Sequence, residues 1–349
     1  MTAYLRKKGV SLSPKKYFVD AMGSMALGLF STLLIGTIFS TLAKYIGWEY
    51  LVSIASFATA STGAVLGIAI GYSLSAPPLV LFSAGVVGYA GNILGATFTI
   101  DGAQKALTAG PAGAFICTLI AVEVGKLVSK ETKIDILVTP TVTILTGTLI
   151  AKLICPAVSY LMYWLGYFIN TATEMQPIFM GIIVSVVVGI ILTLPISSAA
   201  ICAMIGIGGL AGGAATAGCC AQMVGFAVIS FRENRWGGVV AQGLGTSMLQ
   251  MGNIVKNPRI WIPPTLASAI TGPIATAIFA LECKGVSAGM GTCGLVGPLG
   301  IISSTDMNTF TITGLILVCF ILPAVLSLAI SEFMRHMGWI KYGDMTLDV

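Results

Sequence analysis

Residues 206–218 read Gly206-Ile-Gly-Gly-Leu-Ala-Gly-Gly-Ala-Ala-Thr-Ala-Gly218 and lie inside an uncharged run that extends over residues 175–231. A helix that crosses a membrane needs about 20 predominantly apolar residues, so this run is long enough for at least one crossing. Small residues at this density allow helices to pack closely or leave the backbone partly unwound. This part of the sequence therefore predicts a tightly packed membrane protein.

The composition of the whole chain supports the same conclusion. Of its 349 residues, 56% are apolar, 9% are charged and 42 are glycine, whereas soluble domains carry about 25% charged residues. A soluble globule of this size could not cover its surface with so few charges. Other uncharged runs are 50–100, 260–281 and 307–331. The formal charge of +5 is spread over loops and the N-terminal arm, which excludes a nucleic-acid binder.

We expect an all-α polytopic membrane protein with about ten transmembrane helices and one or two re-entrant or broken segments. The sequence Ser75-Ala76-Pro77-Pro78 should end one span and permit a turn before the next. Pro156 should kink or divide a long span, and the glycine-rich segment 285–305 is a re-entrant candidate. The expected spans are 19–43, 51–73, 79–98, 111–128, 136–168, 177–194, 236–255, 260–281 and 310–333, with a broken stretch around 206–218.

The two halves of the chain suggest a two-fold internal repeat, the usual origin of a two-part transporter. Residues 25–36 resemble residues 179–190, and residues 125–147 resemble residues 252–272. Two glycine-rich apolar helices can also look alike without a repeat. The expected parts are a cytoplasmic basic N-terminal arm over 1–18, a first transmembrane repeat over 19–170, a second over 171–335 and a cytoplasmic C-terminal tail over 336–349.

Basic residues indicate the orientation, because cytoplasmic loops carry an excess of Lys and Arg. This rule places the N-terminal arm and the loop 129–135 in the cytoplasm. An inverted second repeat would put four basic residues outside, against the rule, whereas a broken segment between Pro195 and Ser230 would move two of them inside. The topology of the second half is therefore open. The four residues are Arg232, Arg235, Lys256 and Arg259.

Two charged residues fall inside expected helices, where an unpaired charge is costly. Glu123 is a candidate substrate acceptor or proton-coupling carboxylate, or else an interfacial residue paired with Lys126 or Lys130. Lys152 is a candidate charge partner of Glu123, a contact for an anionic substrate, or a side chain that extends along its methylene stem to the interface.

Uncharged polar residues in glycine-rich helices complete the candidate substrate site. Such groups can hydrogen-bond a hydroxylated ligand or bond one helix to another. With Glu123, the substrate-binding candidates are Gln222, Asn92, Thr59, Thr62 and Gly63.

No residue pattern predicts catalysis, a cofactor or a metal site. His336, the single histidine, lies near the C-terminal interface, so a histidine-rich metal site or a Ser/His/Asp hydrolase is unsupported. The eight cysteines form no disulfide framework, and Cys219-Cys220 is more typical of helix packing than of a soft-metal site. The tryptophans fall mostly near span ends, as in an interfacial belt; they are Trp48, Trp164, Trp236, Trp261 and Trp339.

Three motifs resemble a known family. They are Thr59-Ala-Ser-Thr-Gly-Ala-Val-Leu-Gly67, Ala121-Val-Glu-Val-Gly-Lys126 followed by Ile134-Asp-Ile136 and Thr139-Pro140, and Gly212-Gly-Ala-Ala-Thr-Ala-Gly-Cys-Cys-Ala-Gln-Met-Val-Gly225. The chain resembles the membrane IIC subunits of the bacterial phosphotransferase system, specifically their divergent PfoR-type branch. The resemblance implies a homodimeric permease in the bacterial plasma membrane, with separate IIA and IIB proteins as partners that supply any phosphotransfer.

The first functional hypothesis is a IIC-like transporter of a small polar solute, a sugar or sugar-like molecule, that works by alternating access. The alternative is a PfoR-type membrane sensor or regulator, because the chain lacks the Gly-Ile-Thr-Glu-like motif and the intramembrane histidine of typical sugar IIC subunits. A channel is a weaker third hypothesis, since the sequence shows no ring of charged residues.

Overall fold

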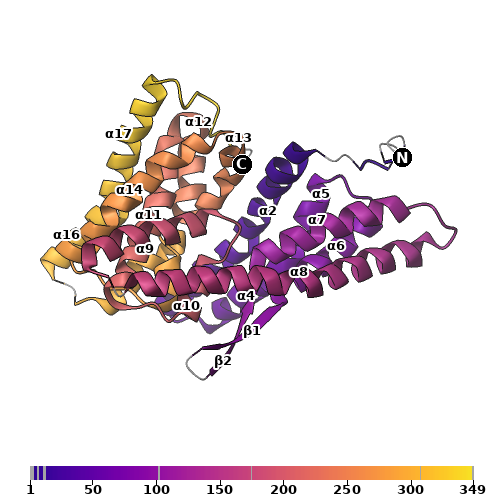
Figure 1. The fold of residues 1–349 in the computed structure, drawn as a ribbon, viewed down its shortest axis with the longest axis horizontal. Coiled ribbons are helices and arrows are strands. Elements are labelled where there is room, and N and C mark those ends of the chain that lie inside the picture. The colour runs from indigo at the N-terminus through magenta and orange to yellow at the C-terminus, as the bar shows by residue number, and fades with distance from the viewer. Residues whose placement is uncertain are drawn as a thin grey trace. The chain divides into compact units, whose positions relative to one another are not determined.

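The computed structural model describes residues 4–5, 8–10, 13–100, 103–173, 175–306 and 308–347. These residues form two compact units (Figure 1). Unit 1 comprises Met1–Ser40 and Trp48–Met162, and unit 2 comprises Thr41–Gly47 and Tyr163–Val349. The main boundary between the two units follows Met162, whereas the first repeat was predicted to end at residue 170.

Unit 1 begins with a helical stretch that alternates between α-helical and π-helical turns. An apolar span of 25 residues, Lys16–Ser40, runs through it and overlaps the span predicted over 19–43. In chain order the parts are η1 (Lys16–Ala21), α2 (Met22–Leu29), η2 (Phe30–Leu34) and α3 (Ile35–Ile46), the last of which continues beyond Ser40 into the segment assigned to unit 2.

The next predicted span is bent. In place of one helix over 51–73, α4 (Glu49–Ala60) and α5 (Thr62–Ser73) meet at an angle of 44°. The turn predicted at the paired prolines is confirmed, because α6 (Pro78–Ile93) begins at Pro78. Proline suits the first turn of a helix, where its missing N–H has no intrahelical partner.

A β-hairpin follows α6 and corrects the span predicted over 79–98. Strand β1 (Gly95–Ile100) pairs antiparallel with β2 (Ala103–Thr108), from Gly95 opposite Thr108 to Ile100 opposite Ala103. The backbone N–H of Ala109 closes the base of the hairpin by donating to the carbonyl of Leu94 at 2.8 Å. Strand β1 is rich in β-branched residues, which pack well on a pleated surface.

Two longer helices follow the hairpin. The first, α7 (Gly110–Val128), confirms the span predicted over 111–128. The second, α8 (Asp135–Thr173), is continuous through Pro140 and Pro156, so of the two predicted effects of Pro156, a kink or a division, the division does not occur. Membrane helices tolerate proline where neighbouring helices and hydroxyl side chains satisfy the freed backbone groups.

Small residues bring the helices of unit 1 into close contact. A Cβ added at Gly67 would overlap the backbone of Ala84 in α6, and one at Gly91 would overlap Gly113 in α7. Helix backbones can approach this closely only where the residues at the interface have little or no side chain, as in other membrane helix pairs. Glycine at these positions therefore sets the spacing of α5, α6 and α7.

Unit 2 is built around α11, a helix of small residues that is almost entirely buried. Its neighbours α9, α14 and α17 pack along it. The predicted span 236–255 is instead a series of short helices with a break at Thr246. In chain order unit 2 contains α9 (Pro177–Thr193), α10 (Ser198–Met204), α11 (Gly209–Ile229), α12 (Phe231–Val240), η3 (Ala241–Gly245), η4 (Ser247–Gln250), α13 (Met251–Lys256), η5 (Pro258–Trp261), α14 (Ile262–Pro273), η6 (Ile274–Ile278), η7 (Gly285–Gly289), η8 (Cys293–Leu295), α15 (Val296–Ser304), α16 (Thr309–Ile316), η9 (Leu317–Ile321) and α17 (Leu322–His336).

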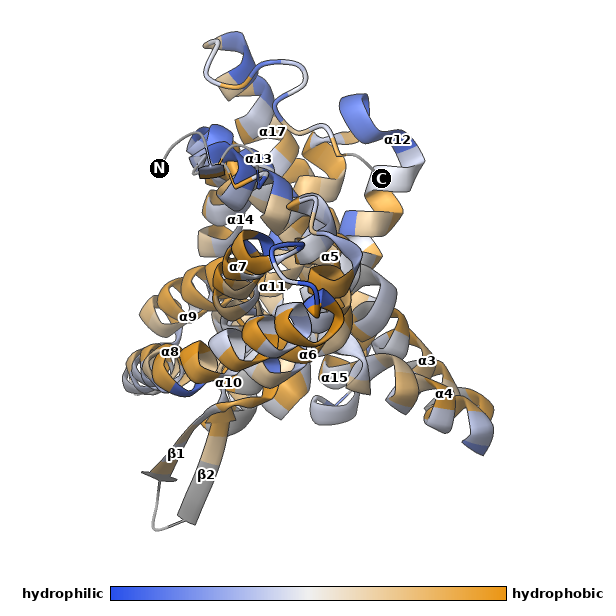
Figure 2. Ribbon diagram, turned by 90° about the vertical axis from the view of Figure 1, so that its right-hand side faces the viewer, coloured by the Kyte–Doolittle hydropathy of each residue, from blue (hydrophilic) through white to orange (hydrophobic). Residues whose placement is uncertain are grey.

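Apolar helices dominate the described residues. Five helices there are long and apolar enough to cross a membrane, or up to six if the bent pair of α4 and α5 counts as one span. Figure 2 shows hydrophobic residues along α7, α8 and α9 and hydrophilic ones at α12 and α13. The structure therefore supports an all-helical membrane protein, with the small β-hairpin as an exception.

Candidate functional site

A buried polar cluster surrounds Gln222 in unit 2. The Oε1 atom of Gln222 accepts hydrogen bonds from Trp261 Nε1 at 3.0 Å and from Thr193 Oγ1 at 3.4 Å. Its Nε2 atom donates to Thr265 Oγ1 at 3.1 Å. Thr193 Oγ1 also lies 2.8 Å from Ser247 Oγ. These five residues are called the Gln222 cluster below.

The partners of Gln222 come from places where helices end. Helix α9 stops at Thr193, where Leu194 takes an extended conformation before Pro195. Ser247 follows the break at Thr246, which is also extended. Trp261 ends the short helix η5 just before α14 begins. Broken helices around a polar centre are the usual way in which membrane transporters form a binding site.

Ser247 reaches the cluster from one end of unit 2. The segment that carries it, the 241–257 hairpin, starts beside Ser230 at the end of α11, where Gln242 Nε2 donates to Ser230 Oγ at 2.8 Å. It finishes near the end of α17, where Asn257 Nδ2 donates to the carbonyl of Trp339 at 3.2 Å. Since α11 rises about 1.5 Å per residue, Gln222 lies about 12 Å along the helix from Ser230. The 241–257 hairpin therefore enters unit 2 and returns to the same end.

A second hairpin matches the segment predicted as re-entrant over 285–305. Its ends meet where the backbone N–H of Glu282 donates to Thr305 Oγ1 at 2.9 Å. Between them, a Cβ at Gly291 would crowd Cys219 on α11, and Thr292 Oγ1 lies 3.6 Å from Met223 Sδ. This segment therefore also enters unit 2 and turns back.

The sequence identified Gln222 but missed the other four residues of the Gln222 cluster. Thr193 stands just before Pro195, and Ser247 lies among glycines, so both positions carried a signal for a helix break. Trp261 was predicted for the interfacial belt, and the sequence did not indicate that its indole nitrogen bonds Gln222. Thr265 follows two prolines at the start of α14.

Four predicted substrate residues lie together in unit 1. A Cβ at Gly63 would crowd Asn92 Cβ at 2.8 Å, so α5 and α6 bring these two residues into contact. Thr62 Oγ1 donates to the carbonyl of Thr59 at 2.7 Å, and Thr59 Oγ1 donates to the carbonyl of Ala55 at 3.0 Å. Both threonine hydroxyls therefore bond backbone carbonyls of the bent pair α4 and α5.

Glu123 lies elsewhere in unit 1. The contact of Gly91 with Gly113 places Asn92 near the start of α7, and Glu123 lies ten residues further along, about 15 Å at 1.5 Å per residue. Its Oε1 atom forms an ion pair with Lys126 Nζ at 3.2 Å, and these side chains are 12% and 1% exposed. The structure therefore shows the ion pair with Lys126, which belonged to one of the two interpretations of Glu123 from the sequence.

The predicted pairing of Glu123 with Lys152 is not formed among the described residues. Lys152 is exposed on α8, whereas Glu123 bonds Lys126 on the next turn of its own helix. An exposed position in an apolar helix agrees with a side chain that extends toward an interface.

Potential metal ligands do not cluster in the part of the chain that the structure describes. Across the described residues, no group of three or more His, Cys, Asp or Glu side chains is arranged to hold a metal ion. The adjacent thiols of Cys219 and Cys220 are free and fully buried in α11.

Helices broken around a buried amide, in a chain this apolar, define a polytopic membrane protein with an internal polar site, the arrangement of a solute permease. The chain belongs to the phosphotransferase system EIIC family, whose family model matches residues 19–347. It is therefore a membrane-embedded, permease-like subunit of that system. Neither a curated protein nor a solved structure matches the chain.

Proposed function

We propose that this chain carries a small polar solute, a sugar or sugar-like molecule, across the membrane by alternating access. The Gln222 cluster is the observation that carries the proposal. An amide nitrogen has two hydrogens, so Gln222 can bond a solute hydroxyl without giving up Thr265. The indole of Trp261 adds an amphipathic surface of the kind that suits one apolar and one polar side of a ligand.

The same proposal assigns phosphotransfer to separate IIA and IIB proteins, because the sequence offers no catalytic residue in this chain. It also includes a homodimer in the bacterial plasma membrane, the PfoR-type branch, about ten crossings and the two-fold repeat, as the sequence predicts. Thr59, Thr62, Gly63 and Asn92 are proposed as a secondary polar patch in unit 1.

The positions of basic residues support a cytoplasmic N-terminus. In unit 1, Lys8 pairs with Glu131 and donates to the carbonyl of Ser129 at 2.5 Å, so the N-terminal arm meets the loop after α7. In unit 2, basic residues gather where α11 and α17 end, which favours the cytoplasm for that end under the positive-inside rule. They are Arg232, Arg235, Lys256, Arg259, Arg335 and Lys341.

The transport proposal is tested in two steps. A thermal-shift screen of sugars, sugar acids and nucleosides on the purified protein first identifies a stabilising solute. Uptake of that solute into proteoliposomes is then compared for the native chain and for Gln222→Ala. Loss of the hydrogen bond from Gln222 to the solute, about 0.5–1.5 kcal/mol, should weaken affinity roughly two- to tenfold.

Gln176→Ala is the matched control, because this exposed glutamine caps α9 without a side-chain bond. Affinity within twofold of the native value, about 0.4 kcal/mol, is expected for the control. Equal affinities of the native chain and Gln222→Ala would contradict the site, and binding without uptake would support a sensor in place of a transporter.

Glu123→Gln tests the role of the other predicted residue. Because Glu123 is already engaged with Lys126, we expect the affinity for the solute to change by less than about twofold, or 0.4 kcal/mol. The same binding assay measures it, with exposed Glu49→Gln as the control. A tenfold loss of affinity in Glu123→Gln alone would place this carboxylate in the solute site.

A further inference from the structure

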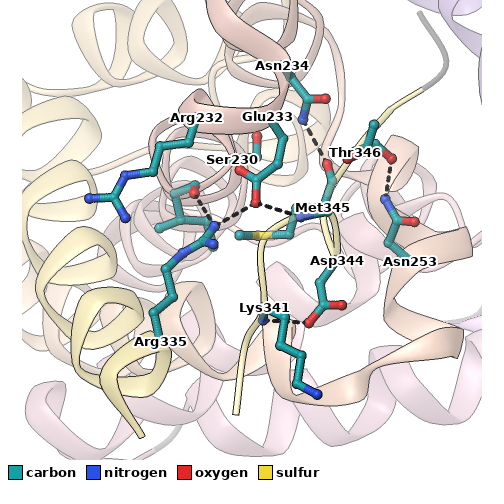
Figure 3. Close-up of polar contacts among 12 residues, drawn as sticks. Ser230, Arg232, Glu233, Asn234, Asn253, Arg335, Lys341, Asp344, Met345 and Thr346 are labelled. Carbon is teal, nitrogen blue, oxygen red and sulfur yellow. Dashed lines mark hydrogen bonds and ion pairs between the residues drawn. The ribbon is translucent and has the colours of Figure 1, made fainter. Parts of the chain in front are cut away.

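The C-terminal tail, residues 339–347, is held in unit 2 by side-chain amides that bind its backbone (Figure 3). Asn234 contacts two tail residues at once. Its Nδ2 atom donates to the carbonyl of Met345 at 2.8 Å, and its Oδ1 atom accepts from the backbone N–H of Leu347 at 2.8 Å. This paired contact resembles the way in which one β-strand binds the next.

Two more amides bind the same stretch from the 241–257 hairpin. Gln250 Nε2 donates to the carbonyl of Met345 at 3.0 Å, and Asn253 Nδ2 donates to the carbonyl of Thr346 at 2.8 Å. Asn257 Nδ2, at the end of the hairpin, donates to Asp344 Oδ2 at 2.8 Å. The hairpin therefore holds the tail along most of its returning half.

Burial anchors the tail as well. The side chain of Met345 is completely buried and that of Ile340 is 2% exposed. The backbone N–H of Gly343 donates to Glu233 Oε1 at 3.4 Å. An apolar side chain with no exposed surface would be returned to water or headgroups if the tail left, so Met345 favours the bound state.

A chain of hydrogen bonds between side-chain amides joins the tail to the interior of the hairpin. Gln250 Nε2 donates to Gln242 Oε1 at 2.9 Å, and Asn253 Nδ2 donates to Gln250 Oε1 at 2.9 Å. Gln242, Gln250 and Ser247 are completely buried. Between Gln242 and Gln250 lies Ser247, whose hydroxyl bonds Thr193 in the Gln222 cluster. One short segment thus contacts the tail on one side and the candidate solute site on the other.

We propose that the C-terminal tail is a latch that keeps the 241–257 hairpin closed over the Gln222 cluster. The hydrogen bonds between the side-chain amides and the tail backbone join neutral groups. Water can replace such hydrogen bonds more easily than hydrogen bonds to charged groups. The hairpin consists of a π-helical turn, a 3-10 turn and a six-residue helix, and none of these is long enough to be stable alone. Release of the tail exposes Ser247 and opens the solute site to that end of unit 2. The control of solute access by the tail rests on the proposed function, whereas the closure of the hairpin by the tail does not.

Cysteine accessibility tests the latch. Ser247→Cys is introduced into the full chain and into a variant that lacks residues 341–349, and both are treated with a hydrophilic maleimide in detergent. Mass spectrometry identifies each labelled cysteine, and the eight native cysteines, all free and buried, serve as internal references. We expect the thiol introduced at position 247 to react at least tenfold faster in the shortened chain, while Cys319 in η9 stays slow.

A synthetic peptide of residues 341–349 provides the second arm. Added to the shortened chain, it should return the labelling rate to that of the full chain, whereas the same peptide with Met345→Asp should not. Asn234→Ala in the full chain, which removes only the paired contact, should raise the rate by a smaller factor.

Equal labelling with and without the tail would overturn the latch. So would equal acceleration at Cys319, because unit 2 would then be loosened as a whole, and so would a peptide without effect. None of these measurements needs a solute. A failed latch therefore leaves the solute site at Gln222 standing, and a failed Gln222→Ala test leaves the latch standing.

Discussion

Arg335→Ala should lower the free energy of unfolding by about 3–5 kcal/mol, the usual cost of leaving one member of a buried ion pair without its partner. Arg335 Nη2 lies 2.9 Å from Glu233 Oε1 and 3.1 Å from the carbonyl of Ile229 at the end of α11. The side chain of Glu233 is completely buried, and that of Arg335 is 10% exposed. Without Arg335, the carboxylate of Glu233 would remain buried with no opposite charge beside it.

Arg232→Ala is the matched control for this prediction. Arg232 pairs with Glu332 at 3.2 Å, but these side chains are 60% and 42% exposed. Water screens such a pair, so its loss should cost about 0–1 kcal/mol. Chemical unfolding in detergent measures both variants. Equal losses for Arg335→Ala and Arg232→Ala would contradict the buried-pair account.

Replacing both partners separates the charge from the packing. Glu233→Met combined with Arg335→Met removes the buried charge and keeps apolar volume, and such replacements are often neutral or stabilising. The double variant should therefore unfold closer to the native chain than Arg335→Met alone. A double variant that is the less stable of the two would show that the pair contributes more than mutual charge compensation.

Gly218→Ala should be the second large loss, about 1–3 kcal/mol, because added volume at a closed helix contact forces the backbones apart. A Cβ at Gly218 would overlap the backbone of Ser185 in α9. Separation of α9 from α11 would also move Thr193 away from Gln222, one turn further along α11. We therefore expect a lower midpoint of thermal unfolding together with weaker solute binding.

Gly237→Ala is the control for the glycine prediction. No atom lies within 4 Å of a Cβ built at Gly237, and this residue sits in the helix α12. Alanine there should be neutral or should stabilise by roughly 0.5–1 kcal/mol, since glycine is a poor helix former. A Gly218→Ala variant as stable as Gly237→Ala would show that α9 and α11 can move apart without cost.

The helices that the sequence predicted well are those with unambiguous ends. Pro77 and Pro78 separate α5 from α6, and α7 ends before the charged loop that begins near Lys130. The β-hairpin was missed because the residues of β1 are as apolar as the helix before them, so hydropathy alone shows no change. At Pro156 the sequence left a kink and a division open, and α8 continues through it without a division.

The candidate site was predicted only in part, because its geometry joins distant segments. Gln222 stands out as an amide in a helix of small residues, but Thr193 and Trp261 reach it from two other elements, and Ser247 joins the cluster through Thr193. The partner of Glu123 was among the predicted alternatives because it lies three residues away. Glu233 and Arg335 are 102 residues apart, and no local pattern connects them.

The composition of α11 also bears on how the protein is inserted into the membrane. Of the five candidate spans in the described residues, α11 has the lowest mean hydropathy, and 89% of its most apolar stretch is buried by protein. Glycine and alanine gain little from lipid, so its residence in the bilayer depends on contacts with other helices. Two of these neighbours, α14 and α17, are synthesised after α11. Stable insertion of α11 is therefore completed only once the ribosome has passed residue 336, at the end of α17, so the middle of the chain is among the last parts to insert stably.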